Sequence, residues 1–191
     1  MIRKPEVQAF LDASGLALRA STTGAAAQAA ETVIDRWAVA GGSGVEAARL
    51  PVCDWIAPAL KLAADGPRSG LAATFGRIER HLRWTRRGSA DINEQTFWNG
   101  HANAVILGPG GLEARDDLWV GVTVMAPGVQ YVDHHHAPEE VYLSLTPGEW
   151  WNAEMDWSDP GPTGAIYNPP GIAHAMRSGV GPFLALWFLP L

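Results

Sequence analysis

The sequence has only one cysteine, Cys53, so no disulfide can form within the chain and nothing requires an oxidising compartment. It has no run of basic residues, and its formal net charge of −6 argues against nucleic acid as a partner. The longest apolar run, 183–189, is too short to cross a bilayer, and the N-terminus lacks an apolar core of signal-peptide length. These absences predict a cytoplasmic protein that binds neither membranes nor nucleic acid.

The bulk composition is that of an ordinary globular protein, with 47% hydrophobic and 18% charged residues. A length of 191 residues suits one domain, or one domain with an extension. Residues 1–88 read as helical, because apolar residues recur at spacings of three and four. We expect a first helix that ends at Gly15, a second over 25–40, a third interrupted by Pro58, and a fourth over 69–84.

Beyond residue 88, short runs rich in valine, isoleucine and aromatic residues alternate with glycine and proline turns. About eight strands are expected, over 104–107, 118–125, 130–136, 141–145, 149–155, 165–167, 172–176 and 183–189. Strands at this spacing suit a double-sheet jelly-roll barrel. The sequence therefore predicts a mainly β protein, with an N-terminal helical region (1–88) that packs on a β-barrel (89–191).

Residues 128–148 concentrate the groups that bind metals. Because side chains on a strand alternate between faces, four even-numbered residues should share one face, and His135 and Glu139 should point away. The four are His134, His136, Glu140 and Tyr142. Pro138 bends the backbone and weakens this argument across the two halves. Imidazoles and a carboxylate on one face suit a transition metal, and the alternative is a solvated histidine cluster.

A second stretch, 164–178, supplies another histidine. Pro169 to Gly171 is a turn signal, and His174 opens the strand that follows it. A lone histidine in such a place is more often a satisfied core residue than a ligand. Beside the first stretch, His174 becomes the natural fourth protein ligand.

These two stretches resemble the two motifs of the cupin superfamily. The first motif matches at Gly128, His134, His136 and Glu140, with seven residues instead of six before its last glycine, Gly148. The second matches at Gly164, Pro169, Gly171 and His174, with a first gap one residue short and Ser178 in place of the usual asparagine. The departures fall on turns and a strand end. The resemblance implies a cupin double-stranded β-helix.

Within the cupins, the strings YVDHHHAPEEVY and NPPGIAHAMRS are similar to those of dimethylsulfoniopropionate (DMSP) lyases of the DddQ type. This resemblance implies a divalent metal held by His134, His136, Glu140 and His174. It also implies Tyr142 as the catalytic base, and a second family tyrosine at Tyr131. The implied reaction is a Tyr-initiated β-elimination that releases dimethyl sulfide and acrylate.

The implied chemistry needs only a Lewis acid, so no organic cofactor is expected, and the partner is a small zwitterion. Zinc is the metal we expect, while iron, manganese, cobalt and nickel also suit these ligands. Aromatic rings can hold the sulfonium by cation–π attraction, and the candidates are Trp119, Trp151 and Trp187. Either a monomer or a homodimer is compatible with the sequence.

Two other functions remain open at the level of sequence. The first is an iron-dependent oxygenase built on the same cupin site, which would require dioxygen. The second is a non-catalytic cupin that binds a small molecule. A complete ligand set accompanied by a tyrosine is more than binding requires, and this favours an enzyme.

Overall fold

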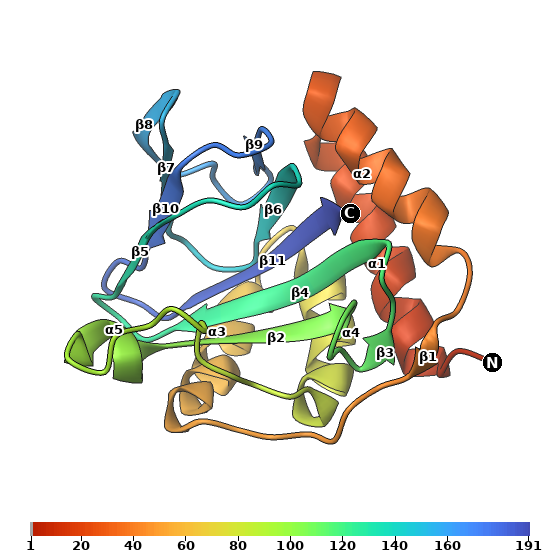
Figure 1. The fold of residues 1–191 in the computed structure, drawn as a ribbon, viewed down its shortest axis with the longest axis horizontal. Helices are drawn as coiled ribbons and strands as arrows, with labels where there is room; N and C mark the ends of the chain where they lie inside the picture. The colour runs from red at the N-terminus through yellow and green to blue at the C-terminus, as the bar shows by residue number, and fades with distance from the viewer. Residues whose placement is uncertain (1) are drawn as a thin grey trace.

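A computed structural model describes residues 2–191 of the chain (Figure 1). The helices are α1 (Pro5–Ser21), α2 (Gly24–Trp37), α3 (Ile56–Ala63), α4 (Ser69–Ile78) and α5 (Gln95–Gly100), with short 3-10 helices η1 (Pro51–Trp55) and η2 (Glu79–His81). None of the described helices is long and apolar enough to cross a membrane.

The strands form two facing sheets. The larger sheet has the order β1-β3-β2-β4-β11-β6-β9, and the smaller has the order β5-β10-β7-β8. Their bounds are β1 (Gly42–Ser43), β2 (His101–Leu107), β3 (Glu113–Ala114), β4 (Leu118–Met125), β5 (Gln130–His134), β6 (Glu140–Ser144), β7 (Glu149–Asn152), β8 (Met155–Ser158), β9 (Ala165–Asn168), β10 (His174–Arg177) and β11 (Phe183–Pro190). All pairings are antiparallel except that of β2 with β3.

The central strands β2, β4 and β11 are buried on both faces, and each face packs in a different hydrophobic core. Even-numbered residues such as Val120, Val122 and Leu186 pack with the helices in one hydrophobic core. Odd-numbered residues such as Met125 and Ala185 belong to a second core inside the barrel. This alternation follows from the two-residue period of a strand. It decides which side chains can reach a site in the barrel interior.

The N-terminal helices cover the outer face of the larger sheet. Figure 1 shows α3 and α4 behind β2 and β4, and α2 passes close to β11 and β6. Phe10, Val33 and Phe75 contribute to the same core as the outer face of the sheet. Burial of this apolar surface stabilises the arrangement by about 25 cal/mol for each Å² removed from water. The helices therefore support the barrel wall from outside.

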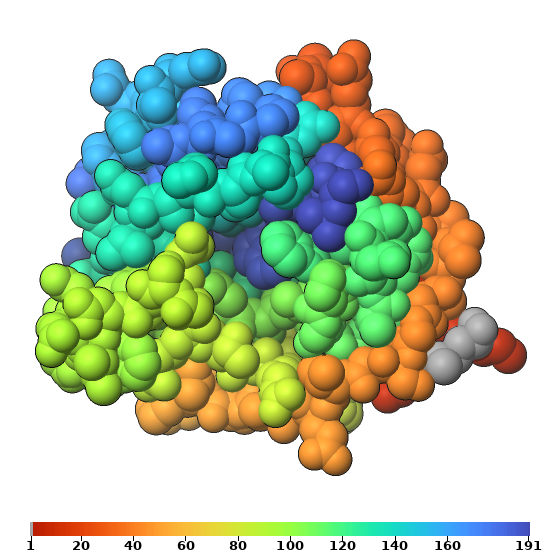
Figure 2. Space-filling view, in the orientation of Figure 1, coloured from red at the N-terminus to blue at the C-terminus, as the bar shows by residue number. Residues whose placement is uncertain are grey.

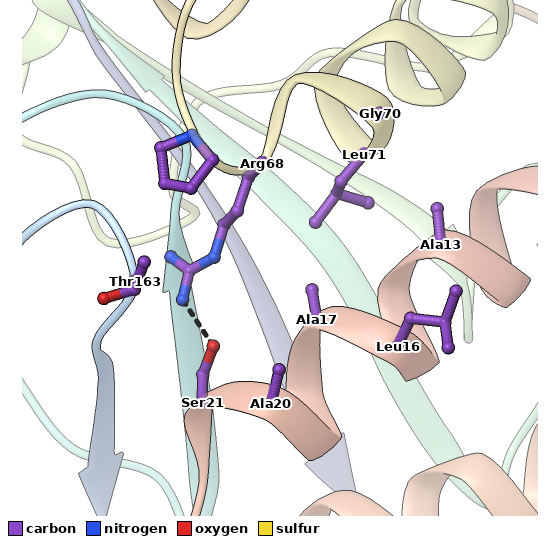
Figure 3. Close-up of a pocket in the computed structure, with 10 residues that line it drawn as sticks. Ala13, Leu16, Ala17, Ala20, Ser21, Arg68, Gly70, Leu71 and Thr163 are labelled. Carbon is purple, nitrogen blue, oxygen red and sulfur yellow. Dashed lines mark hydrogen bonds between the residues drawn. The ribbon is translucent and has the colours of Figure 1, made fainter.

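Arg68, which precedes α4, ties the helices to the barrel (Figure 3). Its guanidinium donates hydrogen bonds to the carbonyl of Ser144 (2.7 Å), the hydroxyl of Ser21 (2.8 Å) and the carbonyl of Gly164 (2.6 Å). Burial lowers the pKa of Arg68 to about 10. No carboxylate within residues 2–191 pairs with it. Peptide dipoles therefore compensate this buried cation.

The fold class expected from the sequence, a cupin barrel with an N-terminal helical region, is confirmed. Several boundaries differ. The first helix continues through the buried Gly15 to Ser21, and a Cβ at Gly15 would lie at ordinary contact distance, 3.5 Å, from Trp37 Cζ2. The expected strand over 149–155 is instead the hairpin of β7 and β8. The division of the chain at residue 88 stays a prediction.

Candidate functional site

Three histidines meet where β5 and β10 lie side by side. His174, at the start of β10, pairs directly with His134 at the end of β5, and His136 follows in the loop. Each ring is held by its Nδ1 at hydrogen-bond distance from a carbonyl two residues away: that of Val132 for His134 (3.0 Å), Pro138 for His136 (2.9 Å) and Ile172 for His174 (3.0 Å). In a neutral ring, a donating Nδ1–H leaves the lone pair on Nε2.

The three histidines offer ligand atoms that all lie within 4.8 Å of one another. Glu140 Oε2 lies 3.2 Å from Nε2 of both His136 and His174. The contact with His174 lacks hydrogen-bond geometry, so its buried Nε2 has no hydrogen-bond partner among the described residues. A buried imidazole nitrogen with no hydrogen-bond partner, pointing toward other ligand atoms, is typical of a residue that coordinates a metal ion. The donor set therefore fits a divalent metal.

The electrostatics of the cluster keep its ligand atoms deprotonated or paired. Burial, and then the nearby His174, lower the pKa of His134 to about 3. Burial opposes a charge on His136 too, but the hydrogen bond and charge of Glu140 outweigh it and raise that pKa. Burial alone would raise the pKa of Glu140, yet its contacts with His136 and His174 lower it to about 2. A carboxylate is thus present at neutral pH.

Two local contacts bring the loop that carries His136 and the turn before His174 together. Gly171 adopts φ +74°, a left-handed conformation that glycine tolerates, and its N–H donates to the carbonyl of His136 (3.0 Å). Asn168 on β9 pairs with Glu140 on β6, and its Nδ2 lies 3.4 Å from Glu140 Oε2. The turn between β9 and β10 is therefore fastened directly to the histidine loop.

The cluster opens onto a cavity of about 350 Å³ inside the barrel. Figure 2 shows a hollow near the middle of the visible face, bordered by yellow-green and teal segments, with blue C-terminal atoms in its depth. Its lining combines the predicted site with the inward faces of the central strands and with the segment before α5. The lining residues are Thr85, Arg86, Arg87, Gly88, Asn103, Val105, Trp119, Thr123, Tyr131, His134, His136, Glu140, Tyr142, Met176, Trp187 and Leu189.

Both predicted tyrosines line this cavity. Tyr142 lies two residues after Glu140 on β6 and is 3% exposed; burial and the charge of Glu140 raise its pKa well above the usual value. Burial also raises the pKa of Tyr131, against the lowering effects of Arg87 and of a hydrogen bond from Asn103. Neither phenol is ionised at neutral pH by the protein alone.

Trp119 and Trp187 line the cavity, whereas Trp151, the third aromatic candidate, does not. Trp151 alternates with the buried Trp150 on β7 and therefore points away from the interior. Trp187 lies against Gly121, its register partner on β4, where a Cβ would come within 2.1 Å of the ring. Gly121 is thus the space in which the Trp187 ring sits.

Of the two residues expected to point away from the cluster, His135 is exposed, and Glu139 accepts a hydrogen bond from the Tyr167 hydroxyl (2.6 Å). Sequence reasoning missed five polar residues of the cavity, which are Thr85, Arg86, Arg87, Asn103 and Thr123. For Asn103 and Thr123 the available signal was polarity at odd positions of strands that are otherwise apolar.

A family model described as dimethylsulfoniopropionate lyase matches residues 26–185, which is most of the chain. The chain belongs to the DMSP lyase family. Over 95 residues it is 37% identical to dimethylsulfoniopropionate lyase DddQ of Ruegeria pomeroyi, an alignment that covers 47% of this chain and 45% of that protein. The match thus spans about half the length of this curated relative.

Two solved DMSP lyase structures share the fold. One comes from the crystal structures of DMSP lyases RdDddP and RnDddQII, with a TM-score of 0.71, 21% identity, and coverage of 97% of this chain and 92% of that one. The other is DddQ from Ruegeria pomeroyi DSS-3, with a TM-score of 0.63, 23% identity, and coverage of 99% and 93%. The resemblance drawn from the motifs is confirmed, and so is membership of a carbon–sulfur lyase family.

Proposed function

We propose that the protein cleaves DMSP to dimethyl sulfide and acrylate in a metal-dependent β-elimination started by Tyr142. The observation that carries this proposal is the convergence of one ligand atom from each of three histidines with the Glu140 carboxylate, beside a buried tyrosine that lines the same cavity. Membership of the DMSP lyase family supports the choice of substrate.

His134, His136, Glu140 and His174 would hold the ion, and zinc is the metal we expect. A bound divalent cation would supply positive charge that stabilises negative charge on the substrate carboxylate and on a neighbouring phenolate. The raised pKa of Tyr142 makes this charge necessary, because burial and Glu140 both disfavour the phenolate.

Tyr142 would accept the proton from the carbon next to the substrate carboxylate. The electrons of that C–H bond would form the C=C bond of acrylate, and those of the C–S bond would leave on sulfur. Sulfonium becomes neutral dimethyl sulfide, so charge balances with one proton on the Tyr142 oxygen. Trp119 and Trp187 would hold the cationic sulfonium against their ring faces until the bond breaks.

Headspace dimethyl sulfide above purified protein supplied with DMSP tests the proposal, with and without a chelator. Activity should vanish on chelation and return with Zn²⁺ under anaerobic conditions, which also excludes an oxygenase. His174→Ala should abolish activity and zinc binding, while His135→Ala should leave both unchanged, since His135 is exposed and outside the cluster. Full activity in the metal-free protein would refute the metal-dependent reaction.

A further inference from the structure

A chain of hydrogen bonds runs along the cavity lining from Trp187 to Tyr131. The indole Nε1–H of Trp187 donates to Thr123 Oγ1 (3.2 Å), and the Thr123 hydroxyl donates to Asn103 Oδ1 (2.7 Å). Asn103 Nδ2 then donates to the Tyr131 hydroxyl oxygen (2.7 Å). All four side chains line the cavity, but Thr123 and Asn103 are no part of the histidine cluster.

The direction of this chain is fixed at its start, because an indole N–H can only donate. Thr123 must therefore accept from Trp187, and its own hydrogen is free for Asn103. If the Asn103 amide were turned over, its NH₂ would face Thr123, and the Thr123 hydroxyl hydrogen would lose its acceptor at a site only 1% exposed. The amide thus presents oxygen to Thr123 and nitrogen to Tyr131.

The orientation of the Asn103 amide determines where the hydrogen of the Tyr131 hydroxyl can point. Because its oxygen accepts from Asn103, this hydrogen cannot point back along the chain. The guanidinium carbon of Arg87 lies 5.8 Å from the Tyr131 ring centroid, and arginine has no acceptor to offer. Within residues 2–191 no group accepts this hydrogen in a hydrogen bond. It is left to a ligand in the cavity.

We propose that Asn103 and Thr123 are positioning residues that hold Tyr131 as a hydrogen-bond donor to the carboxylate of the bound substrate. This inference rests on the proposed function, since DMSP supplies the carboxylate. A neutral phenol suits the task, because donation requires the hydroxyl hydrogen. Tyr131 then binds and orients the substrate, and the proton transfer stays with Tyr142.

Asn103→Asp is the sharpest test, because it keeps the shape and removes the donor. A carboxylate accepts from both neighbours, so Tyr131 would turn its hydrogen toward residue 103 and away from the cavity. The KM for DMSP should rise about 10- to 100-fold, the loss expected for a hydrogen bond to a charged group, with kcat changed much less. Affinity for 4-methylpentanoate, an unreactive carboxylate with carbon in place of sulfur, should fall by the same factor in calorimetric titration.

A double-mutant cycle separates positioning from a general structural defect. Tyr131→Phe should lose the same affinity as Asn103→Asp, and the double variant should lose no more than either one. Thr123→Val, which keeps the shape but removes the hydroxyl, should weaken affinity in the same direction, and Thr123→Ser should restore it. This pair decides the question if Asn103→Asp fails to fold.

Each outcome has a distinct meaning. Unchanged KM and probe affinity in Asn103→Asp, or losses that add in the double variant, would overturn the positioning role. A wild-type protein that releases no dimethyl sulfide would refute the proposed function instead. In that case the titrations with 4-methylpentanoate still decide whether Asn103 directs Tyr131 toward a carboxylate.

Discussion

Gly121→Ala should distort the cavity wall from within. The added methyl carbon would lie 2.1 Å from Trp187 Cη2 and 2.6 Å from the carbonyl oxygen of Ala104. Carbon atoms in contact prefer separations of about 3.5–4.0 Å, so the ring must retreat by more than about 1 Å. The hydrogen bond from Trp187 to Thr123, already 3.2 Å long, cannot survive such a shift.

Overpacking of this kind costs about 1–3 kcal/mol. For a chain of this size, each kcal/mol lowers the melting temperature by about 2–4 °C, so a decrease of about 2–12 °C is expected by differential scanning calorimetry. Gly70→Ala provides the matched control. A Cβ at Gly70 in α4 meets nothing within 4 Å, and alanine should stabilise the helix by about 0.5–1 kcal/mol.

The cause can be checked by measuring the same substitution in a Trp187→Leu background. The decrease in melting temperature caused by Gly121→Ala should shrink there, because the ring that it meets is gone, while the contact with Ala104 remains. An unchanged melting temperature and an unchanged KM in Gly121→Ala alone would refute the assignment of Gly121 as the space for Trp187.

Three further outcomes are expected. Tyr142→Phe should keep stoichiometric zinc, measured by atomic emission, while turnover falls to near the limit of detection; a near-normal rate would remove Tyr142 from the role of base. Saturating zinc at 100 times its dissociation constant should stabilise the wild-type protein by about 2.7 kcal/mol in thermal unfolding but should not stabilise His174→Ala. Glu113 accepts hydrogen bonds from Arg3 and from the N–H of Gly41, and although its burial opposes ionisation, these contacts lower its pKa in the folded state. Glu113→Gln should therefore lower the free energy of unfolding by about 3 kcal/mol above pH 4.5, the ordinary pKa of the group. The difference in unfolding free energy from wild type, measured by denaturant titration, should disappear as the pH falls through the lowered pKa.

The residues that converge on the candidate site were predictable from the sequence because their signals are local. His134 ends β5, His136 lies two residues further on in the loop, and Glu140 begins the next strand. The turn signal at Pro169 to Gly171 predicted that His174 begins a strand, and in the structure His174 pairs with His134. Short-range periodicity and turn chemistry suffice where ligands come from strand ends.

The helical region was predicted less accurately because a glycine can either end a helix or lie within one. Gly15 was expected to end the first helix, yet the helix continues to Ser21, and Leu18 beyond the glycine is buried in the core that the helices share with the sheet. Tertiary packing thus overrides a local stop signal. Helix α5 was missed altogether, since six residues are too few to establish a helical period.

The cavity wall could not be predicted, because its strands are buried on both faces. In β4, Val120 and Val122 face the helices. Trp119 and Met125 lie on the interior side with Thr123, so apolar residues occupy both sides and the alternation of hydropathy is weak. What distinguishes the interior face is a polar residue in a strand with no exposed side. Thr123 meets Asn103 only because β2 and β4 pair in the register that sets them opposite each other. That register depends on long-range pairing, so a buried polar residue in a two-sided strand marks where a site lies before its partners can be named.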